Sequence, residues 1–341
     1  MTPVAPSAEV HAAATARLAD LATPAGALGR LGDLAVWVSA TQGVCPPRAL
    51  ENIRAVIFAG DHGVSDFGVS AYPKAITPAM VYTFLSGGAG VSVLARQHGV
   101  SLRVLDIGVD DDLSGAPAEV KAYKVRRSSG AIHLEDALTP AETQRALEVG
   151  ALIAREEIAA GAQLLIAGDM GIGNTTPTAA MIAAVLGLPA SEVTGRGTGV
   201  AGDALVAKEG LIAQALERTR GRTNDPIEIL TALGSADLAA GVGFLIEAAA
   251  SGVPVLLDGV ISVANALLAE EIAPGSAAWF AAGHRSPEPA QSLALSKLGL
   301  EPILDLGMRL GEGSGAMAAV PVLRSAVALL GEMTLLSELQ M

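Results

Sequence analysis

The sequence predicts an α/β protein with a Rossmann-like parallel sheet flanked by helices. Short apolar runs, such as residues 55–59 and 164–167, alternate with longer segments whose apolar residues recur at helical spacing. The short runs are apolar at nearly every position, as in strands that are buried on both faces. They end in glycine-rich or polar loops. Alternation of strands and helices in this manner is typical of a parallel sheet covered by helices.

In the first half of the chain, the apolar spacing predicts helix, strand, helix and strand in that order, at residues 8–42, 55–59, 77–98 and 102–107. The first helical segment is interrupted by Pro24-Ala25-Gly26, and residues 110–131 are polar and irregular. Thr139 and Glu142 form the signature of a capping box with Pro140 at the first helical position, so a helix begins there and runs to about residue 160.

The second half continues the alternation. Strands are expected at residues 164–167, 255–257, 278–281 and 303–304. Helices are expected at residues 178–187, 203–219, 235–250, 261–271, 288–298 and 315–340. These elements suggest a large α/β domain of residues 50–314 and a small helical domain built from residues 1–49 and 315–341.

Composition excludes several function classes. The net charge of −13 argues against partners such as nucleic acid or an anionic membrane surface. The single cysteine, Cys45, excludes an intramolecular disulfide and a cysteine-rich zinc site, and it favours a reducing cytoplasmic location. The N-terminus lacks the long apolar core of a signal peptide. Residues 170–191 carry no charge but contain a polar, glycine-rich loop, so no membrane span is expected there.

Glycine-rich or polar loops follow five of the expected strands, at residues 60–63, 168–176, 258–259, 283–289 and 305–315. Ligands of open α/β sheets bind beyond the carboxyl ends of the strands. We therefore expect these loops to meet in one composite site. The 39 glycines of the chain exceed the usual share of about 7 %, and many of them lie in these loops.

Two of the loops have the composition of phosphate-binding loops. In the loop at residues 168–176, glycines let backbone N–H groups approach an anion, and the following helix adds partial positive charge. A tight turn with a polar helix cap is the alternative. The loop at residues 195–199 suits an anion-binding nest with Arg196 or Lys208 nearby, or else a surface loop. Its formal GxGxxG pattern follows no strong strand, which argues against dinucleotide binding.

Several titratable residues in the loops are candidates for chemistry. Glu312 stands among glycines before an apolar helix, either as a general base or as an acid that interacts with the helix dipole. Asp61 and His62 form either an acid–base pair or a structural turn. Arg285 is a candidate anion ligand, and Cys45 has no nearby partner for nucleophilic catalysis.

At these same loops the sequence resembles the nicotinate-nucleotide–dimethylbenzimidazole phosphoribosyltransferase (CobT) family. The resemblance covers nearly the whole chain. It is carried by residues 58–64 (FAGDHGV), 68–73 (GVSAYP), 80–81 (MV), 168–176 (GDMGIGNTT), 195–199 (GRGTG), 258–262 (DGVIS) and 305–315 (DLGMRLGEGSG). Such enzymes join the ribose 5-phosphate of nicotinate mononucleotide to a benzimidazole nitrogen for the lower ligand of cobalamin. The resemblance thus implies two small-molecule substrates, no metal or other cofactor, and a homodimer.

The resemblance also implies roles for individual residues. Glu312 corresponds to the catalytic base, and Asp169 is a second acidic group where the family usually has glutamate. Substrate-binding positions are Gly171, Ile172, Gly173, Asn174, Thr175, Gly197, Thr198, Gly199, Lys208, Asp258, Ser286, Gly311 and Gly313. The pocket for the aromatic base corresponds to Tyr72, Lys74, Met80, Phe84 and Leu310, with Lys74 where the family often has glutamine.

Two other functions remain as alternatives. A phosphoribosyltransferase that uses phosphoribosyl pyrophosphate usually has two adjacent acids at its threonine-rich loop, whereas only Asp169 is present here. A protein that binds nucleotides or bases without catalysis would have no need of a base at position 312, and Glu312 is retained. A Rossmann oxidoreductase is disfavoured because the dinucleotide fingerprint lacks its strand–turn–helix context.

Overall fold

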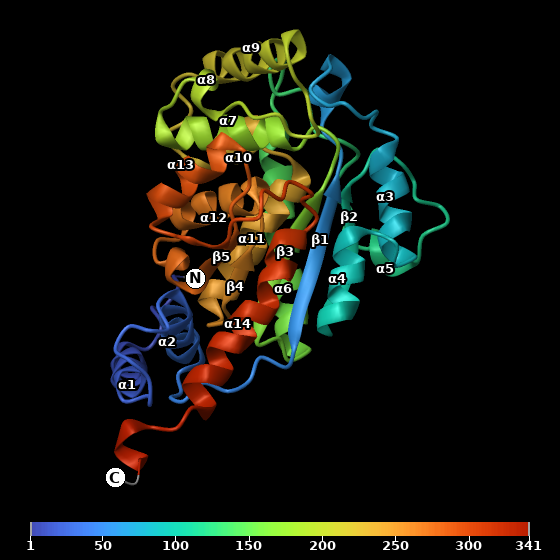
Figure 1. Ribbon diagram of the computed structural model, residues 1–341. Coiled ribbons are helices and arrows are strands. Elements are labelled where there is room, and N and C mark those ends of the chain that lie inside the picture. The colour runs from blue at the N-terminus through green and yellow to red at the C-terminus, as the bar shows by residue number, and fades with distance from the viewer. Residues whose placement is uncertain (1, 340–341) are drawn as a thin grey trace.

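The computed structural model, which describes residues 2–339, has six parallel strands in one sheet (Figure 1). Their order across the sheet is β2-β1-β3-β4-β5-β6. Their bounds are Ile53–Gly60 (β1), Ser101–Gly108 (β2), Leu164–Met170 (β3), Val255–Leu257 (β4), Phe280–His284 (β5) and Pro302–Leu304 (β6). The expected Rossmann-like parallel sheet is confirmed.

Strand β1 lies inside the sheet, next to the edge strand β2, and pairs with β2 on one side and β3 on the other. The chain leaves β1 toward β2 and then returns to the opposite side for β3, so the strand order reverses between β1 and β3. Phe58 of β1 pairs with Asp169 of β3, which brings the two following loops level with each other. Such a switch point is where open α/β sheets bind ligands.

Helices cover both faces of the sheet. In β1, Val56 and Phe58 belong to one buried cluster, whereas Ala55, Ile57 and Ala59 belong to the other. This alternation explains the continuous apolar run, since both sets of side chains need an apolar partner. The helices against the first face are α6 (Pro140–Ala159), α7 (Thr175–Leu186), α9 (Asp203–Arg218), α10 (Pro226–Leu233), α11 (Ala236–Ala250), α12 (Val260–Ile272) and α13 (Pro289–Leu298). Those against the second face include α2 (Arg30–Gln42), α3 (Ile76–Leu85), α4 (Gly90–His98) and α14 (Ser314–Glu332).

Several expected boundaries were wrong. The helix expected at residues 77–98 is two helices, α3 and α4, because Gly87 adopts a left-handed conformation (φ 78°) between them. Helix α10 was not expected. The strand expected at residues 278–281 begins only at Phe280, after a 3₁₀ turn at Ser276–Trp279. The last helix ends at Glu332. In the remainder of the expected segment, a short 3₁₀ turn spans Leu336–Glu338, and residue 340 lies outside the described range.

The N-terminal helices α1 (Ala8–Ala19) and α2 pack together at one end of the molecule, beside the C-terminal part of α14 (Figure 1). Helix α14 also packs against α4 and β5 of the large domain. The side chain of Arg17 in α1 donates to the carbonyl oxygens of Leu330 and Gly331 near the end of α14. The two-domain division at residues 50–314 stays a prediction, with α14 shared between its two parts.

Two helical stretches are long and apolar enough to cross a membrane by length and composition, Ile76–His98 and Ser314–Glu332. The first is α3 and α4 with the glycine turn between them. The second is α14, which packs against α2, α4 and β5. Both stretches therefore have apolar partners within the fold itself.

Candidate active site

A cavity of about 570 Å³ opens at the carboxyl ends of the strands, a size suited to a small-molecule ligand. The loops after β3, β4, β5 and β6 line it, together with α3, the turn before α4 and the segment after α8 (Ala190–Val193). The residues expected from sequence that line it are Tyr72, Met80, Asp169, Gly171, Ile172, Asn174, Thr175, Gly197, Thr198, Asp258, Ser286, Leu310, Gly311 and Glu312.

The other expected site residues lie outside this lining: Gly173, Gly199, Lys208, Gly313, Lys74 and Phe84. Lys74 instead forms ion pairs with Asp66 (3.2 Å) and Asp110 (3.6 Å), and the side chain of Phe84 is buried in the core. The structure therefore does not include Lys74 and Phe84 in the cavity lining, and their role in the base pocket stays a prediction.

The three outlying glycines are explained by backbone geometry. Gly173 and Gly313 have left-handed backbones (φ 91° and 89°), which shape the loops on either side of the cavity. Gly199 (φ 116°) borders a smaller neighbouring cavity. Gly171, in contrast, lines the main cavity and needs to be glycine, because a Cβ there would lie 1.9 Å from the carbonyl oxygen of Gly60.

Glu312 is held in a strained conformation. Its φ of 66° is rare for a residue other than glycine, and its neighbours Gly311 and Gly313 are left-handed too. Glu312 is only 6 % exposed, and its Oε2 atom is buried with no hydrogen-bond partner among the described residues. Burial raises the pKa of Glu312, the backbone N–H of Val91 at the start of α4 opposes this, and the Asp258 carboxylate adds to it. A carboxylate held in this way suits general-base chemistry.

Asp258 explains how the strained conformation is maintained. Its Oδ2 accepts a hydrogen bond from the N–H of Gly313 (3.1 Å), and its Oδ1 accepts from those of Gly315 (2.7 Å) and Ala316 (3.0 Å). The side chain thus binds the N-terminus of α14, where the backbone N–H groups have no intrahelical acceptors. Although Asp258 lines the cavity, its carboxylate is occupied by the loop that carries Glu312, rather than free for a substrate.

Asp169 ends β3 in the same cavity. Its Oδ1 accepts a hydrogen bond from Nδ2 of Asn174 (2.8 Å), while its Oδ2 is buried without a donor in the part of the chain that the structure describes. Burial raises the pKa of Asp169 well above its usual value, and the neighbouring carboxylate of Asp237 in α11 raises it further. Both effects favour the protonated form of Asp169 more than in a free aspartate.

One end of the cavity is polar and rich in backbone N–H groups. The loop that ends in Asn174 and Thr175 leads into the N-terminus of α7, and Ser286 and Thr198 add hydroxyl groups. Thr198 also joins two loops, because its Oγ1 accepts from the N–H of Ala71 (2.9 Å). A helix N-terminus with nearby hydroxyls suits a phosphate group.

Lys208 lies behind this polar end. It is 1 % exposed, and its Nζ donates to Oγ1 of Thr175 (2.9 Å) and to the carbonyl oxygen of Gly195 (3.0 Å). Burial lowers the pKa of Lys208 to about 8, although the carboxylate of Glu288 opposes the shift. Lys208 therefore connects the two polar loops, and its expected direct contact with the substrate stays a prediction.

The pKa of Lys208 predicts a change of stability with pH. Between pH 8 and 10.5 the unfolded chain holds a proton on this lysine that the folded chain has lost, so wild-type stability rises with pH across that window. Relative to Lys208→Met, the free energy of unfolding of wild type should rise by on the order of 3 kcal/mol over the window. Denaturant titrations at several pH values measure this, with exposed Lys297→Met as control. If the free energies of unfolding of wild type and Lys208→Met differ by the same amount at every pH, then Lys208 stays charged in the folded protein.

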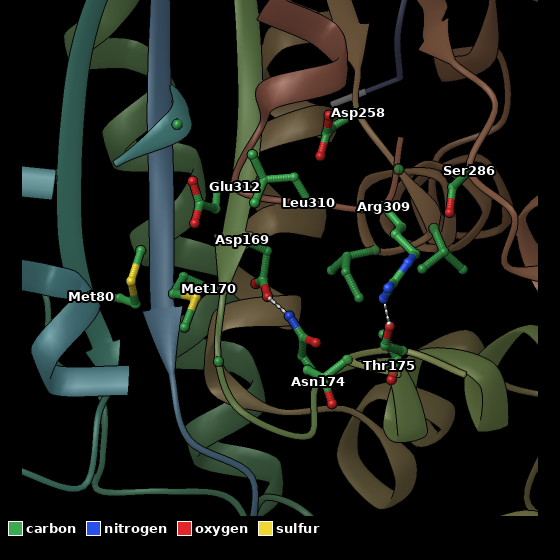
Figure 2. Close-up of a pocket in the computed structure, with 18 of the residues that line it drawn as sticks. Met80, Asp169, Met170, Asn174, Thr175, Asp258, Ser286, Arg309, Leu310 and Glu312 are labelled. Carbon is green, nitrogen blue, oxygen red and sulfur yellow. Dashed lines mark hydrogen bonds between the residues drawn. The ribbon is translucent and has the colours of Figure 1, made fainter. Parts of the chain in front are cut away.

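The opposite end of the cavity is apolar. Ile76, Met80, Met170 and Leu310 contribute aliphatic and thioether groups there, and Tyr72 lies at the rim. Figure 2 shows Asp169 between Met80 and Met170 on one side and Asn174 and Thr175 on the other, with Glu312 above Met170. The cavity therefore offers a flat apolar site and an anion site with two carboxyl groups between them.

Three comparisons with known proteins agree with this geometry. A family model described as a phosphoribosyltransferase matches residues 4–340. A nicotinate-nucleotide–dimethylbenzimidazole phosphoribosyltransferase of Mycolicibacterium paratuberculosis is 52 % identical over 328 residues, covering 96 % of this chain and 93 % of the relative. The one of Mycobacterium tuberculosis is 51 % identical over 334 residues, covering 98 % and 92 %. The chain belongs to this phosphoribosyltransferase family.

A solved structure of a family member supports the same assignment. The crystal structure of CobT from Thermus thermophilus superposes with a TM-score of 0.92 at 43 % identity, over 97 % of this chain and 98 % of that one. The fold shared with this family member therefore extends over 97 % of the chain.

Sequence reasoning gave no site role to several polar residues that line the phosphoribosyltransferase cavity, among them Arg309 and Glu288. Arg309 lines it and donates to the carbonyl oxygen of Gly197 (3.3 Å), although no role was expected for this arginine. The position of Arg309, three residues before Glu312 in the sequence, could have indicated that it lies near the site. Glu288 stands at the N-cap of α13 without a side-chain capping bond, and its Oε1 accepts from the N–H of Gly197 (2.8 Å).

The remaining candidates lie elsewhere. His62 faces Asp237 rather than the cavity, and Arg285 forms an exposed ion pair with Asp305 (3.4 Å). Within residues 2–339, no group of three or more histidine, cysteine or acidic residues has the arrangement of a metal site.

Proposed function

We propose that this protein transfers the 5-phosphoribosyl group of nicotinate mononucleotide to 5,6-dimethylbenzimidazole or a related base. The products are nicotinate and α-ribazole 5′-phosphate, the nucleotide of the cobalamin lower ligand. The observation that carries the proposal is Glu312, a buried carboxylate whose Oε2 has no partner in the described chain, between an apolar end and an anion-binding end of one cavity. The relatives named above bear this activity in their names.

The chemistry needs one base at that position. One nitrogen of the benzimidazole attacks the anomeric carbon while Glu312 takes the proton from the other nitrogen. The bond between the anomeric carbon and the pyridinium nitrogen breaks, and its electron pair stays on the nicotinate ring, which leaves as a neutral pyridine. The leaving group therefore requires no acid. A single direct displacement inverts the anomeric carbon, which gives the α-riboside.

The two ends of the cavity orient the substrates. The phosphate of the nucleotide fits the backbone N–H groups around Gly171 and Thr175 at the start of α7, with Arg309 supplying the positive charge that lines the cavity. The flat base fits between Met80 and Leu310 at the apolar end. This arrangement brings the benzimidazole to Glu312 with the ribose between the two ends.

Chromatography of nicotinate tests the proposal. Purified protein with nicotinate mononucleotide and dimethylbenzimidazole, in a chelator and without added metal, should release nicotinate. Phosphoribosyl pyrophosphate should not replace the nucleotide. An absence of nicotinate with every benzimidazole, purine and phenol tried would refute the function, and activity with phosphoribosyl pyrophosphate and Mg²⁺ would favour the alternative transferase.

We also propose that the protein acts in the cytoplasm as a homodimer. The lone Cys45 suits a reducing compartment. Exposed apolar side chains on α3 and nearby, including Tyr82, Leu85 and Phe67, offer a surface for a second copy. The molar mass in solution tests the dimer.

A further inference from the structure

A buried acid–base pair lies directly behind Asp169 and takes no part in the reaction described above. Nε2 of His62, just after β1, lies 3.4 Å from Oδ2 of Asp237 in the first turn of α11. Their side chains are 0 % and 1 % exposed, and neither residue lines the cavity. A buried ionic pair is costly to maintain, so its position against a cavity residue calls for an explanation.

The hydrogen bonding of Asp169 indicates what the pair does. Oδ1 of Asp169 already accepts from Asn174, but its Oδ2 is buried with no donor among residues 2–339, and the carboxylate of Asp237 is its neighbour. Two carboxylates in contact do not both ionise, and they share one proton. With the proton on Asp169, Oδ2 becomes a donor and Asp237 its acceptor, while Nε2 of His62 lies 3.4 Å from Oδ2 of Asp237.

The acidic residues of the cavity indicate why a protonated Asp169 would favour the binding of an anionic nucleotide. Besides Asp169, the carboxyl groups of Asp258, Glu288 and Glu312 line the cavity, whereas Arg309 and His284 are the basic residues among its described lining residues. Nicotinate mononucleotide, which carries a phosphate and a carboxylate, would bind in this acidic cavity. A fourth ionised carboxylate would weaken its binding by repulsion.

We propose that Asp237 and His62 are positioning residues that keep Asp169 protonated and neutral beside the bound nucleotide. The choice of nucleotide rests on the proposed function, but the protonation of Asp169 does not. The directions of two pKa shifts agree with this proposal. Burial, and then the charge of Asp237, raise the pKa of Asp169. For Asp237, the charge and hydrogen bond of His62 outweigh burial and lower the pKa.

Other titratable groups near the pair are few within the described residues. Asp61, beside His62, has a pKa that burial raises, and the charges of His62 and Asp237 act on it in opposite directions. On the cavity side, Glu312 from the loop before α14 and Asp258 from the loop after β4 are the remaining acids near Asp169. These acids favour a neutral Asp169. The basic groups on the cavity side are Arg309 and His284, and Nε2 of His284 lies 3.5 Å from Oδ1 of Asp258.

Asp237→Asn tests the proposal through the pH dependence of KM for nicotinate mononucleotide. The amide donates a hydrogen bond to an ionised Asp169 and shares no proton with it, so Asp169 ionises as pH rises. The ratio of variant to wild-type KM should therefore increase on the order of tenfold between pH 5 and 8, as expected for one added charge near the ligand. Taking the ratio cancels the titration of the substrate phosphate.

A double variant separates this role from a merely structural one. Asp169→Asn in the Asp237→Asn background removes the new charge and should make the KM ratio independent of pH. Asp106→Asn is the matched control, because Asp106 is a buried carboxyl at the end of β2 that pairs with Lys124 instead. A ratio that stays flat with pH in folded Asp237→Asn would overturn the proposal.

Infrared spectroscopy gives a readout that needs no activity and no Asp237 variant. With ¹³C-labelled aspartate, the wild-type spectrum at pH 8 should contain a protonated-carboxyl band that Asp169→Asn lacks. If Asp169→Asn removes no such band, the proposal fails. If the band is present but wild type releases no nicotinate, the proposed function fails while the protonation of Asp169 stands.

Discussion

Glu312→Gln is expected to lower kcat by about 10²–10⁴-fold, the usual contribution of a general base, while KM for the nucleotide changes little. Glutamine retains the shape of the side chain but cannot accept the benzimidazole proton. The variant also tests pH dependence. Glu312 acts in its ionised form, and its pKa is raised by burial, so wild-type kcat should fall as pH drops through a value above 4.5. The kcat of Glu312→Gln should not show this fall at low pH.

Glu301→Gln is the matched control for this variant, because the Glu301 side chain is 73 % exposed and distant from the cavity lining. It should leave kcat unchanged. Steady-state kinetics across pH 5–9 compare the two variants with wild type. Full activity of Glu312→Gln would move the base role elsewhere, with Asp169 as the next candidate.

Asp258→Ala is expected to have the second large effect, on stability and turnover together. The substitution leaves the N–H groups of Gly313, Gly315 and Ala316 without their acceptor, at a cost of about 3 kcal/mol in the free energy of unfolding. It also releases the left-handed conformation of Glu312, so kcat should fall as well. Denaturant unfolding without ligand measures the first effect, and initial rates measure the second.

Asp305→Ala is the control for Asp258→Ala. Asp305 begins the loop that carries Glu312, and its side chain is 69 % exposed. Its expected effect on unfolding is within about 0.5 kcal/mol. If Asp258→Ala keeps wild-type stability and loses only nucleotide binding, then Asp258 binds the substrate directly, as the sequence resemblance implied.

The fold was predictable because its signals are local. The apolar runs at β1 and β3 require burial on both faces, and the capping box at Thr139 forms within four residues of chain. The missed helix α10 had a local signal too, since Asp225 accepts from the N–H of Ile227 and Pro226 follows it. The break between α3 and α4 depended on Gly87, whose left-handed backbone a hydropathy pattern does not register.

The site was less predictable because partners distant in sequence set the state of its side chains. The composition of the loops indicated which residues would gather, including Glu312 and Asp169. Asp258 accepts hydrogen bonds from residues 55 or more positions away, and Asp237 of helix α11 is a neighbour of Asp169 in strand β3. Both arrangements follow only from the packing of the strands and helices. The neutral state of Asp169 is a property of that packing.

The most direct test of the account is the structure of the product, determined by nuclear magnetic resonance after incubation with nicotinate mononucleotide and dimethylbenzimidazole. A single displacement assisted by Glu312 predicts equal amounts of nicotinate and a benzimidazole riboside phosphate with the α configuration. A product with the β configuration would contradict direct displacement, and a mixture without any riboside product would contradict the transfer itself.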